Sequence, residues 1–266
     1  MNIAVIGGNR FVGKKLVESL VDKKHNVTIF NRSKSGHKDV TKVRFDRDKD
    51  EIDLRYFDCV VDMCLYTLEQ FKSIKEHIPR DTRYIFVSSG AVKYKETFGE
   101  YATEKENVEM DLKRTDLNYT IVRPSYIVGY GNHIRRLGYF IDKLMTSKVI
   151  SIDGGSDYPI NLVHVDDVVE CFTNIIFSTD SLSGKVYNVC SDEETTIDKI
   201  IETIKDELEI EDHITENSSE FVFPNQSFEM DNTRTKQELK MEFTDIKHMI
   251  KLFIESWKNE NHISKS

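Results

Sequence analysis

The feature that most constrains the fold is the junction between the first two expected elements. An apolar segment, Asn2–Ile6, leads directly into Gly7-Gly8-Asn9-Arg10-Phe11-Val12-Gly13, and a helical pattern follows. Glycine permits a tight turn after a strand, and a glycine one turn into the helix lets that helix pack closely on the strand. The junction therefore predicts a strand–turn–helix unit.

Apolar, β-branched segments alternate with helical patterns along the rest of the chain, which is typical of a parallel sheet covered by helices. The expected strands are Asn2–Ile6, Asn26–Phe30, Val43–Phe45, Asp58–Met63, Tyr84–Val87, Asn118–Val122, Val149–Ile152 and Val186–Val189. The expected helices are Arg10–Asp22, Leu68–His77, Tyr101–Arg114, Ile134–Met145, Asp166–Phe177, Thr195–Leu208 and Asp245–Trp257, with Asp166 as an N-cap. The pattern predicts an α/β fold with a doubly wound parallel sheet.

The glycine-rich junction has the chemistry of a phosphate-binding loop. A helix that starts directly after glycines presents free N–H groups and a partial positive charge, which suit the pyrophosphate of a dinucleotide. Arg10 stands where a second spacer glycine is common, and an ordinary turn that binds nothing is the alternative. The residues expected to hold a cofactor here are Gly7, Asn9, Arg10, Phe11, Val12 and Gly13.

The position of this loop at the start of the chain suggests how the chain is divided. We expect residues 1–125 to form a dinucleotide-binding Rossmann-type core. Residues 126–266 would complete the sheet and form a small C-terminal substrate-binding lobe, and both parts would belong to one structural unit.

The residues after the second expected strand bear on which dinucleotide is bound. An acidic residue there would bind the adenosine ribose and repel a 2′-phosphate, but this chain has Asn31 and Arg32. Together with Arg10, Arg32 suits a 2′-phosphate, because guanidinium groups bind phosphate oxygens in pairs. NADP is therefore favoured over NAD. Asp46 is a candidate for the adenine amino group, with a solvated loop aspartate as the alternative.

A Ser–Tyr–Lys set follows the expected strand Tyr84–Val87. Ser88 and Ser89 end that strand, and Tyr101 and Lys105 are four residues apart on an expected helix, so they share a face. An ammonium beside a phenol should lower the pKa of Tyr101, so that it exchanges protons near neutral pH. Ser89 can hydrogen-bond the same substrate oxygen. Such a set can oxidise an alcohol or reduce a carbonyl next to a nicotinamide.

These motifs together resemble the short-chain dehydrogenase/reductase superfamily, in its extended or atypical NAD-dependent epimerase/dehydratase branch. Further matching segments are Asp62-Met63-Cys64-Leu65-Tyr66-Thr67, Arg123-Pro124 with Gly129 and Asn132, Val163-His164-Val165-Asp166-Asp167, and Gly184 with Tyr187-Asn188-Val189. The resemblance implies that Ser89, Tyr101 and Lys105 are catalytic. It also implies that Arg32, Asp46 and the backbone near Met63, Cys64 and Leu65 hold the cofactor, and that Lys105 bonds the nicotinamide ribose.

The resemblance also implies a substrate class: the enzyme would act on a hydroxyl or keto group of a nucleotide-sugar-like substrate. Arg135 and Arg136 would face that substrate after Asn132, and one of them would grip a diphosphate; a solvated helix face is the alternative. Ser89 is followed by Gly90 and Ala91 instead of an acidic pair, so a dehydratase ranks below an epimerase or a reductase.

Composition and charge limit the partners. With 37 basic and 46 acidic side chains the net charge is −9, so broad nucleic-acid binding is disfavoured. No apolar segment is long enough for a membrane span or a secretory signal, so we expect neither. The four cysteines form no CxxC pair and are expected to be buried thiols in a reducing cytoplasm. Neither a metal site nor a disulfide is expected. Relatives allow a homodimer packed through the helix that carries Tyr101, and a non-catalytic member that binds RNA or senses NADP is the alternative function.

Overall fold

The computed structural model describes residues 1–152, 155–217, 223 and 226–260. These residues form two compact units that interleave along the chain. The first unit consists of Met1–Ser125, Asp166–Val189 and Asn232–Met241, and the second of Tyr126–Val165, Cys190–Asp231 and Glu242–Ser266.

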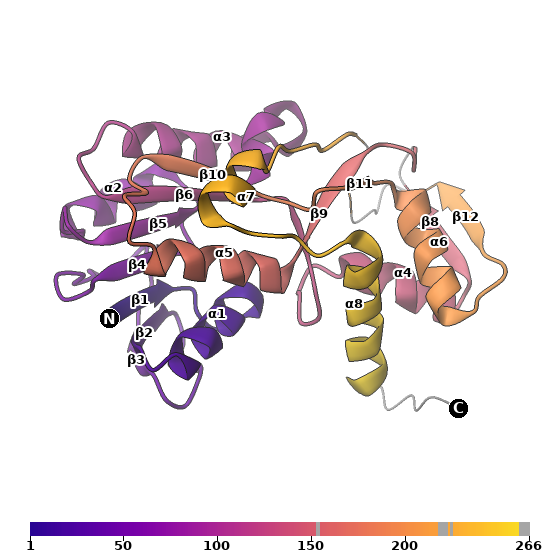
Figure 1. Ribbon diagram of the computed structural model, residues 1–266, viewed down its shortest axis with the longest axis horizontal. Helices are drawn as coiled ribbons and strands as arrows, with labels where there is room; N and C mark the ends of the chain where they lie inside the picture. Colours follow the sequence, from indigo (N-terminus) through magenta and orange to yellow (C-terminus); the bar gives the residue numbers. More distant parts are fainter. Residues whose placement is uncertain (153–154, 218–222, 224–225, 261–266) are drawn as a thin grey trace. The chain divides into compact units, whose positions relative to one another are not determined.

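The first unit is built on one sheet of seven strands in the order β10-β6-β5-β4-β1-β2-β3 (Figure 1). All neighbouring pairs in it are parallel. The strands are β1 Asn2–Ile6, β2 Asn26–Asn31, β3 Thr41–Arg44, β4 Cys59–Asp62, β5 Arg83–Val87, β6 Tyr119–Pro124 and β10 Lys185–Val189. The strand order reverses beside β1, as in a doubly wound sheet. The predicted Rossmann-type α/β fold is confirmed.

Helices cover both faces of this sheet. They are α1 Phe11–Asp22, α2 Leu68–Ile74, α3 Lys95–Leu112, α5 Val165–Phe177 and α7 Thr233–Leu239, with short 3₁₀ turns η1 Lys75–His77 and η2 Gly90–Lys93. Apolar side chains from α2 and α3 pack with alternate residues of β1, β4, β5 and β6 in one buried cluster, which includes Phe71, Tyr84, Phe86 and Val108. Burial of this shared apolar face is the main term that holds the helices on the sheet.

The second unit contains two small sheets. One has the order β11-β9-β7 and the other pairs β12 with β8. Its strands are β7 Tyr126–Val128, β8 Val149–Ile152, β9 Ile160–His164, β11 Glu194–Thr195 and β12 Ile214–Asn217, and its helices are α4 Arg136–Met145, α6 Ile197–Leu208 and α8 Ile246–Glu260. Thr196 caps α6, because its side chain accepts a hydrogen bond from the Lys199 N–H.

Several expected elements differ from those observed. The helix α3 starts at Lys95, earlier than Tyr101, and the short strands β7, β9, β11 and β12 and the helix α7 were not expected. The expected N-cap at Asp166 is wrong, because α5 begins at Val165. Asp166 therefore lies in the first turn, where its Oδ1 accepts a 2.5 Å hydrogen bond from Lys15 of α1. Within the described residues, no helix combines the length and the hydropathy needed to cross a membrane.

Candidate active site

The loop between β1 and α1 brings backbone very close to backbone. Gly7 has a φ of +98°, and a Cβ on it would lie 2.3 Å from Cys64 Sγ. A Cβ on Gly13 would lie 2.3 Å from the Gly7 carbonyl oxygen. Only glycine fits at these two positions, so the start of α1 packs directly against the carboxyl end of β1.

The start of α1 fits the dinucleotide expected from the sequence. Arg10 is in the N-cap position with an extended backbone, and no side chain caps the first turn. Phe11, the first helical residue, has a φ of +41°, which is strained for a non-glycine residue. The first-turn N–H groups therefore have no side-chain acceptor, as a site for a pyrophosphate requires.

Unsatisfied polar atoms support the same fit. Asn9 Oδ1, in the loop, and Asn31 Nδ2, at the end of β2, are both buried and have no hydrogen-bond partner among the described residues. Buried polar groups in folded proteins are nearly always hydrogen-bonded, so a bound ligand or water is needed at each. Both residues belong to the set that the sequence predicts to hold the cofactor.

The other predicted cofactor residues lie in the segments that follow β2, β3 and β4. Arg32 is exposed just after β2. Asp46 lies in a loop after β3, where its carboxylate is 3.6 Å from Lys49 Nζ. Met63, Cys64 and Leu65 follow β4 directly. The Met63 N–H donates a 3.0 Å hydrogen bond to the Ile6 carbonyl oxygen, which extends the pairing of β4 with β1.

Ser89 and Tyr101 are brought together by the end of β5 and by α3. Ser89 caps η2, and its Oγ accepts a 3.2 Å hydrogen bond from the Ala91 N–H. Within α3, Gly99 has non-helical angles (φ 53°, ψ −130°), so Tyr101 and Lys105 lie on the helical segment after this kink. The Ser89 side chain also lies close enough to the Tyr101 phenol to act on its pKa, in the direction that lowers it.

The electrostatics of Tyr101 differ from the expectation. Tyr101 keeps 43% of its surface exposed, yet partial burial of the phenol raises its pKa, and the Ser89 hydrogen bond only opposes that rise. Lys105 Nζ lies 5.9 Å from the centre of the Tyr101 ring, facing the π system. The expectation that Lys105 lowers the pKa of Tyr101 is therefore wrong for this structure, and Tyr101 is a protonated phenol at neutral pH.

Lys105 is buried, with 2% of its surface exposed. Its Nζ donates to the Leu65 carbonyl oxygen at 2.6 Å and to the Val87 carbonyl oxygen at 2.8 Å, at the ends of β4 and β5. Burial lowers the pKa of Lys105 to about 8, and the Asp62 carboxylate is the strongest opposing influence. A lysine in this state changes its charge close to physiological pH.

Two buried acidic residues that the sequence analysis did not assign lie next to this set. Glu109 is 1% exposed, accepts from Ser88 Oγ at 2.5 Å, and forms a two-point ion pair with Arg123 of β6. Asp62 is fully buried at the end of β4 and pairs with Arg47. The sequence signal for a role of Glu109 was its position one helical turn after Lys105. For Asp62 the signal was that a carboxylate ends an otherwise apolar strand.

The three predicted substrate residues all belong to the second unit, and they do not converge. Asn132 Nδ2 donates to the Ile127 carbonyl oxygen at 2.9 Å, and Arg135 forms an ion pair with Asp142. Both residues line a cavity of about 600 Å³ with Trp257 and Phe253. Arg136 lies instead against aromatic rings, 4.3 Å from the centre of Tyr126, and burial lowers its pKa to about 10.

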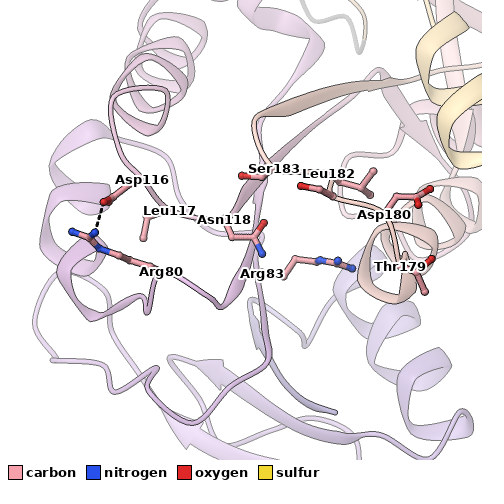
Figure 2. A pocket seen from close by; sticks show the side chains of 10 residues that line it. Arg80, Arg83, Asp116, Leu117, Asn118, Thr179, Asp180, Leu182 and Ser183 are labelled. Carbon is pink, nitrogen blue, oxygen red and sulfur yellow. Dashed lines mark ion pairs between the residues drawn. The ribbon is translucent and has the colours of Figure 1, made fainter.

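Another cavity, of about 350 Å³, lies in the first unit (Figure 2). It is lined by Arg83, the first residue of β5, and by residues that precede β6 and β10, including Asn118 and Ser183. These are the amino ends of the parallel strands, whereas ligands of doubly wound sheets bind at the carboxyl ends. Among the described residues, no cluster of His, Cys, Asp or Glu is arranged to hold a metal ion.

Comparison with known families agrees with this geometry. Residues 89–190, from the proposed catalytic serine to just beyond β10, match the NAD dependent epimerase/dehydratase family. The resemblance expected from the sequence is confirmed.

Solved structures of sugar-nucleotide enzymes share the fold. UDP-glucose 4-epimerase from Thermotoga maritima superposes with a TM-score of 0.80 at 19% identity, over 98% of this chain and 100% of that one. UDP-glucuronic acid 4-epimerase from Bacillus cereus, in complex with UDP-glucuronic acid and NAD, gives 0.82 at 15% identity with the same coverage. The NDP-hexosamine 5,6-dehydratase TunA gives 0.76 at 17% identity, over 97% of this chain and 98% of that one.

A curated relative carries a different name. The chloroplast stem-loop binding protein of 41 kDa b from Arabidopsis thaliana is 26% identical over 228 residues, which cover 74% of this chain. The matched part spans 60% of the length of that relative.

Proposed function

We propose that this chain is an NAD(P)-dependent enzyme that acts on a hydroxyl or keto group of a nucleotide-sugar substrate. The observation that carries the proposal is the contact between Ser89 and Tyr101 beside the buried Lys105. The matched family and the sugar-nucleotide ligands of the structural neighbours support it.

Each residue of the set has a defined task. Tyr101 is protonated at neutral pH, so it can donate a proton to a carbonyl oxygen that is being reduced and recover it from the alcohol in the reverse direction. Ser89, whose side chain acts on the Tyr101 phenol, orients the same substrate oxygen. Lys105 holds a positive charge close to both and would bond the nicotinamide ribose. The bound cofactor supplies the site that accepts or donates the hydride.

The glycine loop, Arg10 and the orphaned polar atoms of Asn9 and Asn31 are the proposed cofactor site. Exposed Arg32 favours a 2′-phosphate and hence NADP, although the Bacillus cereus epimerase named above is in complex with NAD. Calorimetric titration with NAD⁺ and NADP⁺ tests this choice. Arg32→Ala should weaken NADP⁺ binding at least about tenfold and leave NAD⁺ binding nearly unchanged; equal losses for both cofactors would refute the 2′-phosphate argument.

The reaction is proposed to be an epimerisation or a reduction. Gly90 and Ala91 follow Ser89, so the acidic pair typical of a dehydratase is lacking at that point of the chain. One of Arg135 and Arg136 is the proposed contact for the substrate diphosphate, with Asn132 near them in the sequence.

The decisive experiment is turnover of UDP-sugars by wild type and by Tyr101→Phe. Removing the phenol hydroxyl should lower kcat by about 100-fold or more while cofactor affinity is kept. Tyr56→Phe, which changes a tyrosine that is 73% exposed in another loop, is the matched control and should keep full activity. Unchanged turnover in Tyr101→Phe would remove Tyr101 from the catalytic set.

A second candidate function is RNA binding or NADP sensing without catalysis, which the stem-loop binding relative favours. The net charge of −9 counts against it, because nucleic-acid affinity depends on basic side chains. Filter binding of a stem-loop RNA at about 50 mM and about 200 mM salt separates the two functions. Salt-dependent binding by a protein that turns over no sugar nucleotide would select the second candidate.

We also propose a cytoplasmic location and a homodimer packed through α3. No disulfide joins the cysteines of the described residues, as in reducing compartments. Light scattering of the purified chain tests the dimer, and a monomer at micromolar concentration would contradict it.

A further inference from the structure

A buried ion pair lies at the carboxyl end of the central strands. Arg47 Nη2 is 2.6 Å from Asp62 Oδ1, and the two side chains are 7% and 0% exposed. The same carboxylate accepts a 2.9 Å hydrogen bond from the Tyr84 hydroxyl at Oδ2 and a 3.3 Å bond from the Cys64 N–H at Oδ1. Both oxygens of Asp62 are therefore engaged.

Arg47 depends on this single partner. Its Nε and Nη1 are buried without a hydrogen-bond partner among the described residues, and its guanidinium carbon lies 6.0 Å from the centre of the Phe45 ring. A buried guanidinium with most of its donors unused is costly unless its charge serves a purpose. The pair is thus not explained by packing or hydrogen bonding alone.

Lys105 lies over the same strand ends. Asp62 of β4 is in register with Phe86 of β5, and the Lys105 ammonium is 5.1 Å from the Phe86 ring. The ammonium bonds the carbonyls of Leu65 and Val87, which follow those two strand positions. Lys105 therefore lies near the buried pair without a hydrogen bond to it, and its own bonds are to neutral oxygens.

The groups that face Lys105 are few. From β4 and its following loop come Asp62 and Cys64, from the loop after β3 comes Arg47, and from its own helix comes Glu109. The phenols of Tyr66 and Tyr101 also face it, with ring centres 5.0 and 5.9 Å from Nζ. Glu109 and Asp62 are each paired with an arginine, but Asp62 ends the strand whose following loop binds the Lys105 ammonium. We therefore single out the Asp62–Arg47 pair as the charges that act on it through the protein interior.

We propose that Arg47 and Asp62 are positioning residues that act as an opposed pair on Lys105, with Asp62 holding its proton and Arg47 limiting that attraction. The pair would set the pH at which Lys105 loses its charge, and with it the alkaline limit of the reaction. Only the expected effect on turnover rests on the proposed function. The expected effect on the charge of Lys105 is independent of it.

The test measures Lys105 directly in the full-length protein. The ¹³Cε resonance of Lys105, in protein labelled with [¹³C]lysine and assigned by its loss in Lys105→Arg, is followed against pH. Asp62→Asn should move the Lys105 titration to lower pH by on the order of 1 pH unit, and Arg47→Met should move it to higher pH. If Asp62→Asn does not fold because Arg47 is left unpaired, Arg47→Met carries the test, since Tyr84 and Cys64 still bond Asp62.

Two further variants make the test specific. Arg47→Lys restores a cation and should return the titration towards its wild-type midpoint. The matched control is Asp50→Asn, which removes the carboxylate that pairs with Arg44 and accepts from the Asp46 N–H in the same loop, and it should leave the titration unmoved.

Turnover is then measured against pH in the same proteins, and its alkaline limit should move with the Lys105 titration. Titrations that stay in place in both Arg47→Met and Asp62→Asn, or that move in the same direction, would overturn the inference even in an active enzyme. Opposite shifts in a protein that turns over no sugar nucleotide would support it while the proposed function fails.

Discussion

Ser88 Oγ donates a 2.5 Å hydrogen bond to Oε1 of the buried Glu109. This bond ties the end of β5, and therefore the adjacent Ser89, to the helix that carries Tyr101 and Lys105. Arg123 of β6 completes the arrangement by pairing with the same carboxylate. The relative placement of Ser89 and Tyr101 is thus fixed by a charged group that neither of them contacts.

The first prediction concerns this group. Glu109→Gln leaves Arg123 without its carboxylate, so the free energy of unfolding should fall by about 3 kcal/mol, as for other broken buried pairs. Urea unfolding followed by circular dichroism measures it. Glu106→Gln, which breaks the more exposed pair with Lys95 on the same helix, is the control and should cost under about 1 kcal/mol. Equal losses in the two variants would contradict the role given to Glu109.

The second prediction concerns the loop before α1. In Gly13→Ala the new methyl group would lie 2.3 Å from the Gly7 carbonyl oxygen, so the helix must move away from the strand. Affinity for NAD(P), measured by calorimetry, should fall at least about tenfold. Gly138→Ala, in α4, is the matched control, because the nearest neighbour of the new Cβ would be Phe253 Cζ at 3.5 Å, an ordinary contact distance. That change should stabilise the protein by about 0.5–1 kcal/mol and spare cofactor binding; a Gly13→Ala protein with normal affinity would refute the close approach.

The third prediction uses the cavity at the amino ends of the strands (Figure 2). Arg83 there bonds three carbonyls at the end of α5, those of Ile175, Ile176 and Ser178, at 2.5, 2.8 and 3.0 Å. Arg83→Met should lower the free energy of unfolding by about 2 kcal/mol, because charged donors are lost from a helix C-terminus. Arg80→Met, in the same cavity, removes only an exposed pair with Asp116 and should change it by under about 0.5 kcal/mol.

Turnover gives a second readout for these two arginines. Both variants should keep the wild-type kcat, since the cavity lies at the opposite ends of the strands from Ser89 and Lys105. A loss of turnover in Arg83→Met, at a temperature where it is fully folded, would contradict the assignment of the active site to the carboxyl ends.

The fourth prediction follows from the charge state of Lys105. Its pKa of about 8 is below the ordinary value of a lysine, so between about pH 8 and about pH 10 the unfolded chain binds more protons than the folded one. Stability from this group is therefore lowest below pH 8 and rises with pH. Between about pH 7 and about pH 9 the wild type should gain about 1 kcal/mol relative to Lys105→Met.

Denaturant unfolding at each pH measures this difference. The control is Lys113→Met, which removes an exposed lysine at the end of the same helix and should show no such trend, because that ammonium stays in water in both states. A constant difference between wild type and Lys105→Met would show that Lys105 is not buried in its charged form.

The central part of the fold was predictable from local sequence. The strand β1, the glycines and the stripe of α1 are adjacent in the chain, and the i, i+4 spacing of Tyr101 and Lys105 is a property of one helix. In contrast, β7, β9 and β11 are short segments that pair over long separations, so no local period marks them. Periodicity also could not locate the start of α3, because Gly99 interrupts the helix before Tyr101.

The electrostatics were less predictable than the fold. Helical spacing places Lys105 on the side of Tyr101, but the direction of the ammonium depends on the carbonyls of Leu65 and Val87, which come from two strands distant in sequence. The pKa of Tyr101 therefore moves opposite to the prediction. The pairing of Asp62 with Arg47 was not predicted for the same reason, since it joins the end of β4 to the loop after β3.

The anchoring of Lys105 on main-chain oxygens has a consequence for redesigning this protein. Any amino acid at positions 65 and 87 presents the same carbonyl group, so the lysine does not depend on the identity of those side chains. Substitutions at Val87 can therefore be made while the ammonium keeps its two acceptors, whereas Leu65 is fully buried in the core of the sheet and tolerates only apolar residues of similar size.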